Sequence, residues 1–327
     1  MSQNYDRACT VTIDGLGTYV CHPDSCRVRF SIKAATTNVP NTATIRLTNI
    51  NRSKAEAFAK DPGSEGKGVT ISAGYQDNAG VIFTGHVVRP IYGRENPTDT
   101  LMQILCADGN QAHTHATVNK TLPPGSTPQD IVDTAIKSMS QYAVKLGFVG
   151  PNVQLSQPKY PRSITLVGMA RKFLDDVARS KGATWNYSNG QVQILKPSDS
   201  MPGGSYVLNS ATGLIGMPTL TPDGVYVRTL INPQFAPNMQ VHIDQSLIQG
   251  YLPAVSPAGT VAPNYLGQGE NLASIAADGI YRIVKIDTEA DTRGEPWYMD
   301  MLVIKPGEHT AVTNDYDNGT QGYSGTN

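Results

Sequence analysis

Apolar and polar residues alternate along much of the first third of the chain. Residues 43–47 and 69–75 place apolar side chains at every second position, with Thr, Arg, Ser or Gly between them. Segments of this period, separated by turns rich in Gly, Asn and Pro, are typical of an antiparallel β-sandwich or β-barrel. We therefore predict β-structure over residues 9–117, interrupted by one short helix over residues 53–60.

The pattern changes to a helical period within residues 127–197. Thr127 is a good N-cap, proline follows at the first helical position, and Asp130 lies at the capping-box position, so a helix is predicted to begin here. A second helix is predicted over residues 165–181, because its apolar residues form one stripe: Val167, Ala170, Leu174, Val177 and Ala178. Two alternating runs then flank Asn189-Gly190, the strongest short signal for a β-hairpin. This segment is predicted to be a small α+β insert.

From residue 205 onward the two-residue period returns. Three segments of this region resemble segments of the first β-region, in the same order along the chain. They are 226–233 with 44–51, 238–244 with 68–75, and 286–304 with 87–105, where Arg293 and Pro296 align with Arg94 and Pro97 without a gap. Three matches in one order predict a duplicated β-barrel with the insert between the two copies.

The predicted fold class is therefore mainly β, with two related antiparallel β-barrel domains and a small α+β insert. The predicted domains are a first barrel over 1–120, the insert over 121–200, a second barrel over 201–306, and a flexible polar tail over 307–327.

A long loop over residues 246–278 interrupts the second barrel. It is rich in Gly, Pro and Ala, and a loop of this length is usually functional. It carries too many apolar side chains for a solvated linker, so we predict that it is an interface loop. The candidate interface residues are Leu247, Ile248, Tyr251, Leu252, Tyr265 and Leu266.

Length and charge narrow the functional classes. A chain of 327 residues exceeds what one hydrophobic core usually supports, so two or more domains are expected. The formal net charge is −1 and the charges are evenly spread, which leaves no basic footprint for nucleic acid. The sequence has neither a long apolar window nor a signal-peptide start, so we expect no membrane insertion and no export.

Four cysteines are candidate metal ligands. Cys21, His22 and Cys26 are close in sequence, and Cys9 precedes them, but the spacing matches no common zinc motif. Small buried side chains on adjacent strands are the favoured interpretation, particularly for Cys9 and Cys106. Without an export signal, disulfides are not the default either.

Two histidines suggest a second metal hypothesis. If residues 111–117 form a strand, His113 and His115 share one face, with Asp108 near them. A polar strand end is the simpler interpretation, and no hydrolase, nucleotide-binding or dinucleotide-binding motif occurs in the chain. We predict no catalytic residue, no cofactor and no metal.

Several segments resemble the baseplate hub family of contractile-tailed phages. They are 42–58, 170–194, 212–244 and 279–304. The most specific piece is the motif Asp291-Thr292-Arg293-Gly294-x-x-Trp297. The family often has His and Gly where this chain has Thr288 and Ala290.

The resemblance implies two barrels like those of the tail tube protein, in a homotrimer at the distal end of the tube. Such hubs meet the tube protein or a tube initiator and the tape-measure protein above, the central spike below, and other baseplate proteins around them. They surround the channel through which DNA passes. The implied location is the virion tail, assembled in the host bacterial cytoplasm, and the implied role is not enzymatic. The alternatives are a receptor- or glycan-binding tail protein, or a metal-dependent hydrolase built on His113 and His115.

Overall fold

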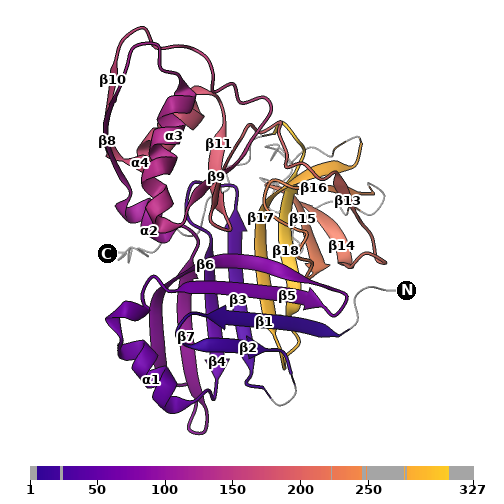
Figure 1. Cartoon of the computed structure of the whole chain (residues 1–327). Helices are drawn as coiled ribbons and strands as arrows, with labels where there is room; N and C mark the ends of the chain where they lie inside the picture. The colour runs from indigo at the N-terminus through magenta and orange to yellow at the C-terminus, as the bar shows by residue number, and fades with distance from the viewer. Residues whose placement is uncertain are drawn as a thin grey trace, which may run out of the picture.

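The computed structural model describes residues 6–22, 25–221, 223–244, 248, 276 and 278–308. Within these residues thirteen strands form one curled sheet, which is antiparallel except where β13 pairs with β16. The main path of the sheet runs β14-β15-β18-β17-β3-β4-β7-β6-β5-β1-β2, and β16 and β13 branch from β17 (Figure 1). The predicted fold class, mainly β with a small helical part, is confirmed.

The strands lie close to the predicted segments. In the first half of the sheet they are β1 (Arg7–Ile13), β2 (Gly17–Val20), β3 (Val28–Ala35), β4 (Thr42–Thr48), β5 (Gly68–Tyr75), β6 (Asn78–Arg94) and β7 (Thr100–Ala107). In the second half they are β13 (Ser205–Leu208), β14 (Leu214–Thr221), β15 (Gly224–Leu230), β16 (Gln240–Ile243), β17 (Ile280–Asp291) and β18 (Trp297–Ile304). The predicted short helix is α1 (Arg52–Lys60), which Asn51 caps; a 3-10 turn, η1 (Pro62–Ser64), follows it.

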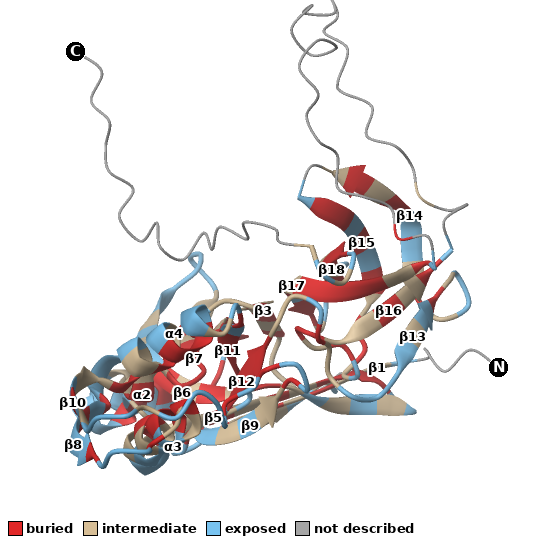
Figure 2. Cartoon of the chain, turned by 90° about the horizontal axis from the view of Figure 1, so that it is seen from above, coloured by how far each residue is buried: buried red, intermediate tan, exposed pale blue. Residues whose placement is uncertain are grey.

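Both halves contribute to one hydrophobic core. Alternating apolar side chains of most of the strands are buried together, so that Ile45 and Ile104 of the first half belong to the same cluster as Val227 and Met301 of the second. Figure 2 shows buried residues along β15, β17 and β18. Phe58 of α1 and Phe235 are also buried in this core. They lie on equivalent connections, Phe58 between β4 and β5 and Phe235 between β15 and β16.

The two halves share their strand order. The path β3-β4-β7-β6-β5-β1 of the first half has the same strand order as β14-β15-β18-β17-β16-β13 of the second. The outermost pairs differ in direction, because β1 is antiparallel to β5 and β13 is parallel to β16. A register shift interrupts β6 between Val87 and Arg89, and the corresponding shift interrupts β17 between Ile283 and Lys285. The predicted duplication is therefore visible in the topology.

These bulges set the alignment of the two hairpins. With Val87 matched to Ile283, Arg94 corresponds to Ala290 and not to Arg293, so the gapless alignment of Arg94 with Arg293 was wrong by three residues. The turn after β17 is one residue longer than the turn after β6 when they are aligned in this way.

The insert folds around a core of its own. Its elements are α2 (Asn110–His115), β8 (Thr117–Leu122), α3 (Pro128–Met139), η2 (Ser140–Tyr142), β9 (Lys145–Val149), β10 (Ile164–Met169), α4 (Ala170–Ser180), β11 (Thr184–Ser188) and β12 (Gln191–Leu195). The insert lies at one end of the sheet (Figure 1). The predicted capping box at Thr127 and the hairpin turn at Asn189-Gly190 are both confirmed.

The second predicted helix begins later than expected. Residues 165–169 belong to β10, which pairs with β8, and the helix α4 starts at Ala170. Gly168 has a φ of 141° that a helix cannot contain, and the β-branched Thr165 and Val167 favour a strand. Val167, which was expected in the helix core, is exposed.

Candidate functional site at the joint of the sheet

The two halves of the sheet meet where β3 pairs with β17. The antiparallel register runs from Arg29 opposite Asp291 to Ala35 opposite Lys285. The joint continues into the turn, because Thr292 N donates to Val28 O and Val28 N donates to Thr292 Oγ1, both at 3.0 Å. The motif that begins at Asp291 therefore lies at the end of this joint.

Asp291 is a buried carboxylate that binds cations from the first half. Arg27 donates to Oδ1 through Nε at 3.0 Å and to Oδ2 through its terminal nitrogen, which is a bidentate pairing. The backbone N–H of Arg293 also donates to Oδ1, at 2.9 Å. Burial opposes ionisation of Asp291, but the Arg27 and Arg293 hydrogen bonds and the charges of Arg27 and Arg29 outweigh it, so its pKa lies below the usual value.

The Asp291 carboxylate lies so close to Gly294 that no side chain fits at this position. A Cβ at this position would lie 2.3 Å from Asp291 Oδ2, closer than any side chain could tolerate. Arg293 crosses to the first half, where its guanidinium donates to Ser25 O. Each of the first four motif residues therefore has a structural role. Asp291 binds Arg27, the Thr292 hydroxyl accepts from Val28 N, Arg293 reaches Ser25 O, and Gly294 leaves room for the Asp291 carboxylate.

Trp297 completes the motif from the first position of β18. Its ring packs edge-to-face on Phe30, with centroids 6.1 Å apart, and the Arg7 guanidinium lies 5.4 Å from the ring centroid. Arg7 also donates to Asp291 O at 3.0 Å. We name Arg7, Arg27, Asp291, Thr292 and Trp297 the joint clasp.

Sequence reasoning identified the second-half side of the joint clasp but missed Arg7 and Arg27. Both lie far before Asp291 in the sequence: Arg7 by 284 residues and Arg27 by 264 residues. No local pattern distinguishes them from other strand-flanking arginines.

A second set of polar contacts attaches the insert to the first half. Asp108, directly after β7, accepts from Gly190 N at 2.8 Å, and Asn41 Nδ2 donates to Tyr187 O at 2.8 Å. Burial raises the pKa of Asp108 to about 7, although hydrogen bonds from the Gly190 and Asn189 backbones lower it. Asp108 is thus committed to holding the hairpin turn.

The structure does not place His113 and His115 on one face as a metal site would require. Residues 110–115 form the helix α2 and not a strand, so side chains two positions apart point in different directions. His113 packs against Tyr187 and His115 against Tyr142, with ring centroids 6.0 and 6.5 Å apart. Burial lowers the pKa of His113 to about 4, and the charge of Arg171 acts in the same direction.

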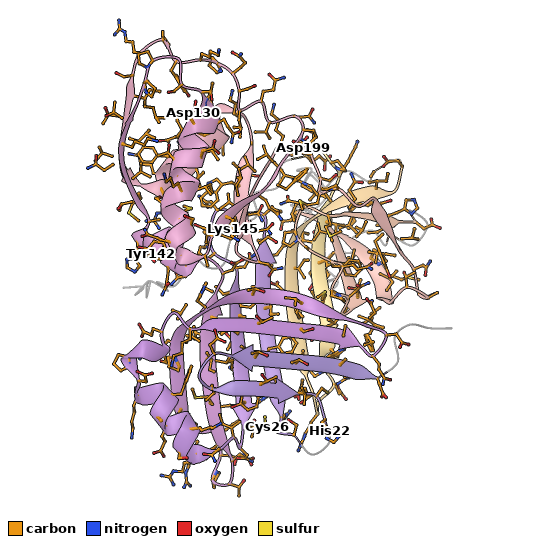
Figure 3. The ribbon with its side chains drawn as sticks, in the orientation of Figure 1. His22, Cys26, Asp130, Tyr142, Lys145 and Asp199 are labelled. Carbon is orange, nitrogen blue, oxygen red and sulfur yellow. The ribbon has the colours of Figure 1, made fainter. Side chains whose placement is uncertain are left out.

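The four cysteines all lie in the first half. Cys9 and Cys106 are buried, Cys21 and Cys26 are partly buried, and all four are free thiols. Figure 3 places Cys26 and His22 at the end of the molecule opposite Tyr142 and Asp130 of the insert. Among the described residues no group of three or more His, Cys, Asp or Glu side chains is arranged to hold a metal.

Most of the candidate interface loop lies outside the described residues. This applies to Leu247, Tyr251, Leu252, Tyr265 and Leu266, and also to the tail from residue 309. Ile248 is described, is partly buried and packs against the core of the sheet. No helix in the described part of the chain is long and apolar enough to cross a membrane.

The curled, duplicated sheet is an architecture of tail proteins. The fold is similar to the 43 kDa tail protein of prophage MuSo2 from Shewanella oneidensis, with 11% identity, a TM-score of 0.58, and coverage of 92% of this chain and 97% of that one. It is also similar to a tail protein from Neisseria meningitidis MC58, with 9% identity, a TM-score of 0.55, and coverage of 93% and 98%.

A type VI secretion component shares the fold as well. This is the E. coli c3393 protein, itself described as structurally similar to the T4 tail proteins gp27 and gp5, with 11% identity, a TM-score of 0.52, and coverage of 91% and 77%. No curated protein sequence matches the chain. The sequence matches the model of the family Baseplate hub gp41 over residues 8–249, and the chain belongs to this family of structural phage baseplate proteins.

Proposed function

We propose that this chain is the hub of a phage baseplate and that three copies form a ring with pseudo-sixfold symmetry. The ring joins the hexameric tail tube to the trimeric central spike and surrounds the DNA channel. The proposal extends the family assignment, which establishes a structural role in the baseplate.

The repeated topology is the observation that carries this proposal. A joint between a sixfold tube and a threefold spike must present six similar surfaces on one side and three on the other. A chain with two halves of the same strand order and the same bulge supplies two such surfaces, and three copies supply six. Cyclic closure then requires heterologous contacts, first half to second half, within and between copies.

The joint clasp is assigned a structural role in this ring. It holds the first-half to second-half contact inside each chain, because Arg7 and Arg27 bind the turn that follows β17. A buried carboxylate saturated by arginine and backbone donors is poorly placed for acid–base chemistry, so we assign it no catalytic, cofactor or metal role.

The partners follow from the position of the ring. The tube protein or a tube initiator and the tape-measure protein contact one face, the spike contacts the other, and further baseplate proteins surround the insert, which we place on the outer side. DNA is in contact only during transit, and assembly takes place in the host bacterial cytoplasm. We further propose that the tail after residue 307 is dispensable for folding.

Electron microscopy of the particle tests this function. Three copies of the chain on the tail axis, between tube and spike, are the expected result. Six copies per ring, or a position at the periphery of the baseplate, would contradict it. A peripheral position together with binding on a glycan array would favour the receptor-binding alternative.

A further inference from the structure

Two stretches of strand edge have no partner among the described residues, although their counterparts in the other half are paired. The first is the outer edge of β14, which ends the sheet path. The second is residues 88–94 of β6, because β5 pairs with β6 only as far as His86 and the connection before β5 reaches only Val87. Beyond the bulge, this part of β6 pairs on one side with β7 alone.

The internal joint shows what the counterparts of these edges do. By the matched bulges, residues 89–94 of β6 correspond to residues 285–290 of β17. By its place next to β15, β14 corresponds to β3, which lies next to β4. Within one chain β3 pairs with residues 285–291 of β17. The equivalent pairing, between β14 and residues 89–94 of β6, does not occur within the described chain.

We infer that β14 of one copy pairs antiparallel with residues 88–94 of β6 in the next copy, in the register of the β3–β17 joint. This rests on the ring of the proposed function and names the surfaces that close it. Three internal joints and three joints between copies then alternate around the ring, and the sheet continues from chain to chain.

Burial differs between the paired and unpaired versions of this segment. Ile286, Thr288 and Ala290 of β17 are 4%, 2% and 4% exposed. Their counterparts Pro90 and Tyr92 are only half-buried, and Arg94 is exposed.

The unpaired edges also carry apolar side chains that remain in solvent in the single chain. Val88 and Ile91 of β6 are exposed, as are Ile215 and Met217 of β14 and Tyr226 of the adjacent β15. A partner strand on each edge would cover part of this apolar surface, and an unpaired apolar edge otherwise favours aggregation.

The internal joint also fixes the expected register. Ser31 opposes Glu289, and transfer to the equivalent strands places Thr219 of one copy opposite Gly93 of the next. Thr219 also opposes Tyr226 on its other side, so Ile91 and Tyr226 share the face formed across the new joint. Pro90 has no N–H to donate, so the ladder is centred on Tyr92 and Gly93.

This pair is suited to a cross-link. Thr36 N donates to Val284 O and Thr292 N to Val28 O, so the hydrogen-bonded pairs of the internal joint fall on even positions of β17. Glu289 with Ser31 is therefore a non-hydrogen-bonded pair, in which Cα atoms lie about 4.5 Å apart. The equivalent Gly93 and Thr219 should have the same spacing.

The full-length chain with Cys21→Ser, Cys26→Ser, Gly93→Cys and Thr219→Cys tests the inference. Under mild oxidation by glutathione disulfide, two thiols form one disulfide while one glutathione disulfide is reduced to two glutathiones. Covalent trimers on non-reducing gels are expected, with none from either single-cysteine variant. Leu220→Cys in place of Thr219→Cys shifts the register by one residue to the other face and should give at least tenfold less product.

A charge variant provides an independent readout. Ile91→Lys should abolish the trimer in native mass spectrometry, whereas Val81→Lys, on the paired part of the same strand and similarly exposed (48% against 44%), should not. A trimer that forms normally without the Gly93–Thr219 cross-link and tolerates Ile91→Lys would overturn the inference and leave the ring intact. A chain that stays monomeric at all concentrations, without cross-links, would count against both.

Discussion

The two halves of the sheet have the same strand order but differ where they meet other strands. In the second half β17 is paired on both edges along its length, and its turn is held by the joint clasp. In the first half the matching part of β6 is paired on one edge only. Equivalent core positions remain similar: Met102, Ile104 and Cys106 of β7 and Met299, Met301 and Val303 of β18 are all buried.

The difference shows which residues were free to diverge. Core positions keep their burial because both halves must cover the same concave face. The joint positions differ in the burial of their carboxylates, since Asp291, which binds Arg27, is 8% exposed, while the corresponding Glu95, which binds Arg29, is 32% exposed. Duplication therefore supplied the scaffold, and the joint acquired its specificity through side chains at the ends of strands.

Removing the Trp297 ring should have the largest effect on stability. Trp297→Ala empties a buried site against Phe30 and Arg7, and such truncations cost about 4 kcal/mol. At the corresponding position of the first half, Thr100→Ala should cost less than about 1 kcal/mol. Urea unfolding followed by circular dichroism measures both changes. Equal losses of unfolding free energy would mean that the β6–β7 and β17–β18 hairpins contribute equally to stability at this position.

Removing the Asp291 carboxylate should have the next largest effect. Asp291→Ala leaves Arg27 and the Arg293 N–H without their acceptor, so we expect a loss of about 3 kcal/mol. Glu95→Ala removes a more exposed carboxylate and should cost roughly 0–1 kcal/mol. The same unfolding experiment compares them, with Asp291→Asn expected between the two. A loss below about 1 kcal/mol for Asp291→Ala would contradict the role of the joint clasp.

The strands were predictable because each half-buried segment alternates in sequence. The duplication was also detectable, since shared burial at positions such as Ile45 and Val227 preserves a weak similarity. The start of α4 was missed because Val167 and Ala170 fit a helical stripe, while the φ of Gly168 leaves no trace in periodicity.

The site was only half predictable for a similar reason. Asp291, Thr292, Gly294 and Trp297 form a compact motif that can be seen in sequence. Arg7 and Arg27 join it only after β1 and β3 have been placed beside β17, and a long-range pairing between unlike residues gives no periodic signal.

The end of the hairpin also distinguishes the two halves. Asp108 follows β7 and is buried against the insert, whereas Lys305 follows β18 and is exposed. The pKa of Asp108 is raised by burial from 3.8 to about 7, so its contribution to stability is complete below about pH 4 and is lost as pH rises toward 7.

Asp108→Asn should therefore remove a pH dependence. Between pH 5 and pH 8 the parent chain should lose about 2 kcal/mol from this group, and the variant should lose little of it, because an amide does not ionise in this range. The amide oxygen can still accept from Gly190 N, so the variant should keep the fold. Unfolding midpoints at the two pH values measure the difference, with the exposed Asp133→Asn as control. An unchanged pH slope in Asp108→Asn would show that Asp108 is ionised in the folded chain.

The smallest effect concerns thiols, which occur in the first half and not in the second. Burial raises the pKa of Cys9 and of Cys106 to about 12, and the nearby Cys21 and Cys26 add to the shift at Cys9. At pH 8 both thiols are protonated as well as buried, so in a Cys21→Ser, Cys26→Ser background a maleimide should label them only through local opening.

Cys9 lies two residues from Arg7, which the joint clasp holds, whereas Cys106 lies on β7 between β4 and β6. Arg7→Ala removes the hydrogen bonds to the Asp291 and Gly294 carbonyls and the contact with the Trp297 ring. It should therefore speed labelling of Cys9 by about tenfold or more and leave Cys106 nearly unchanged, as read by mass spectrometry of peptides. If both thiols accelerate together, the first half opens as one unit and the joint clasp stabilises all of it rather than the β1 edge alone.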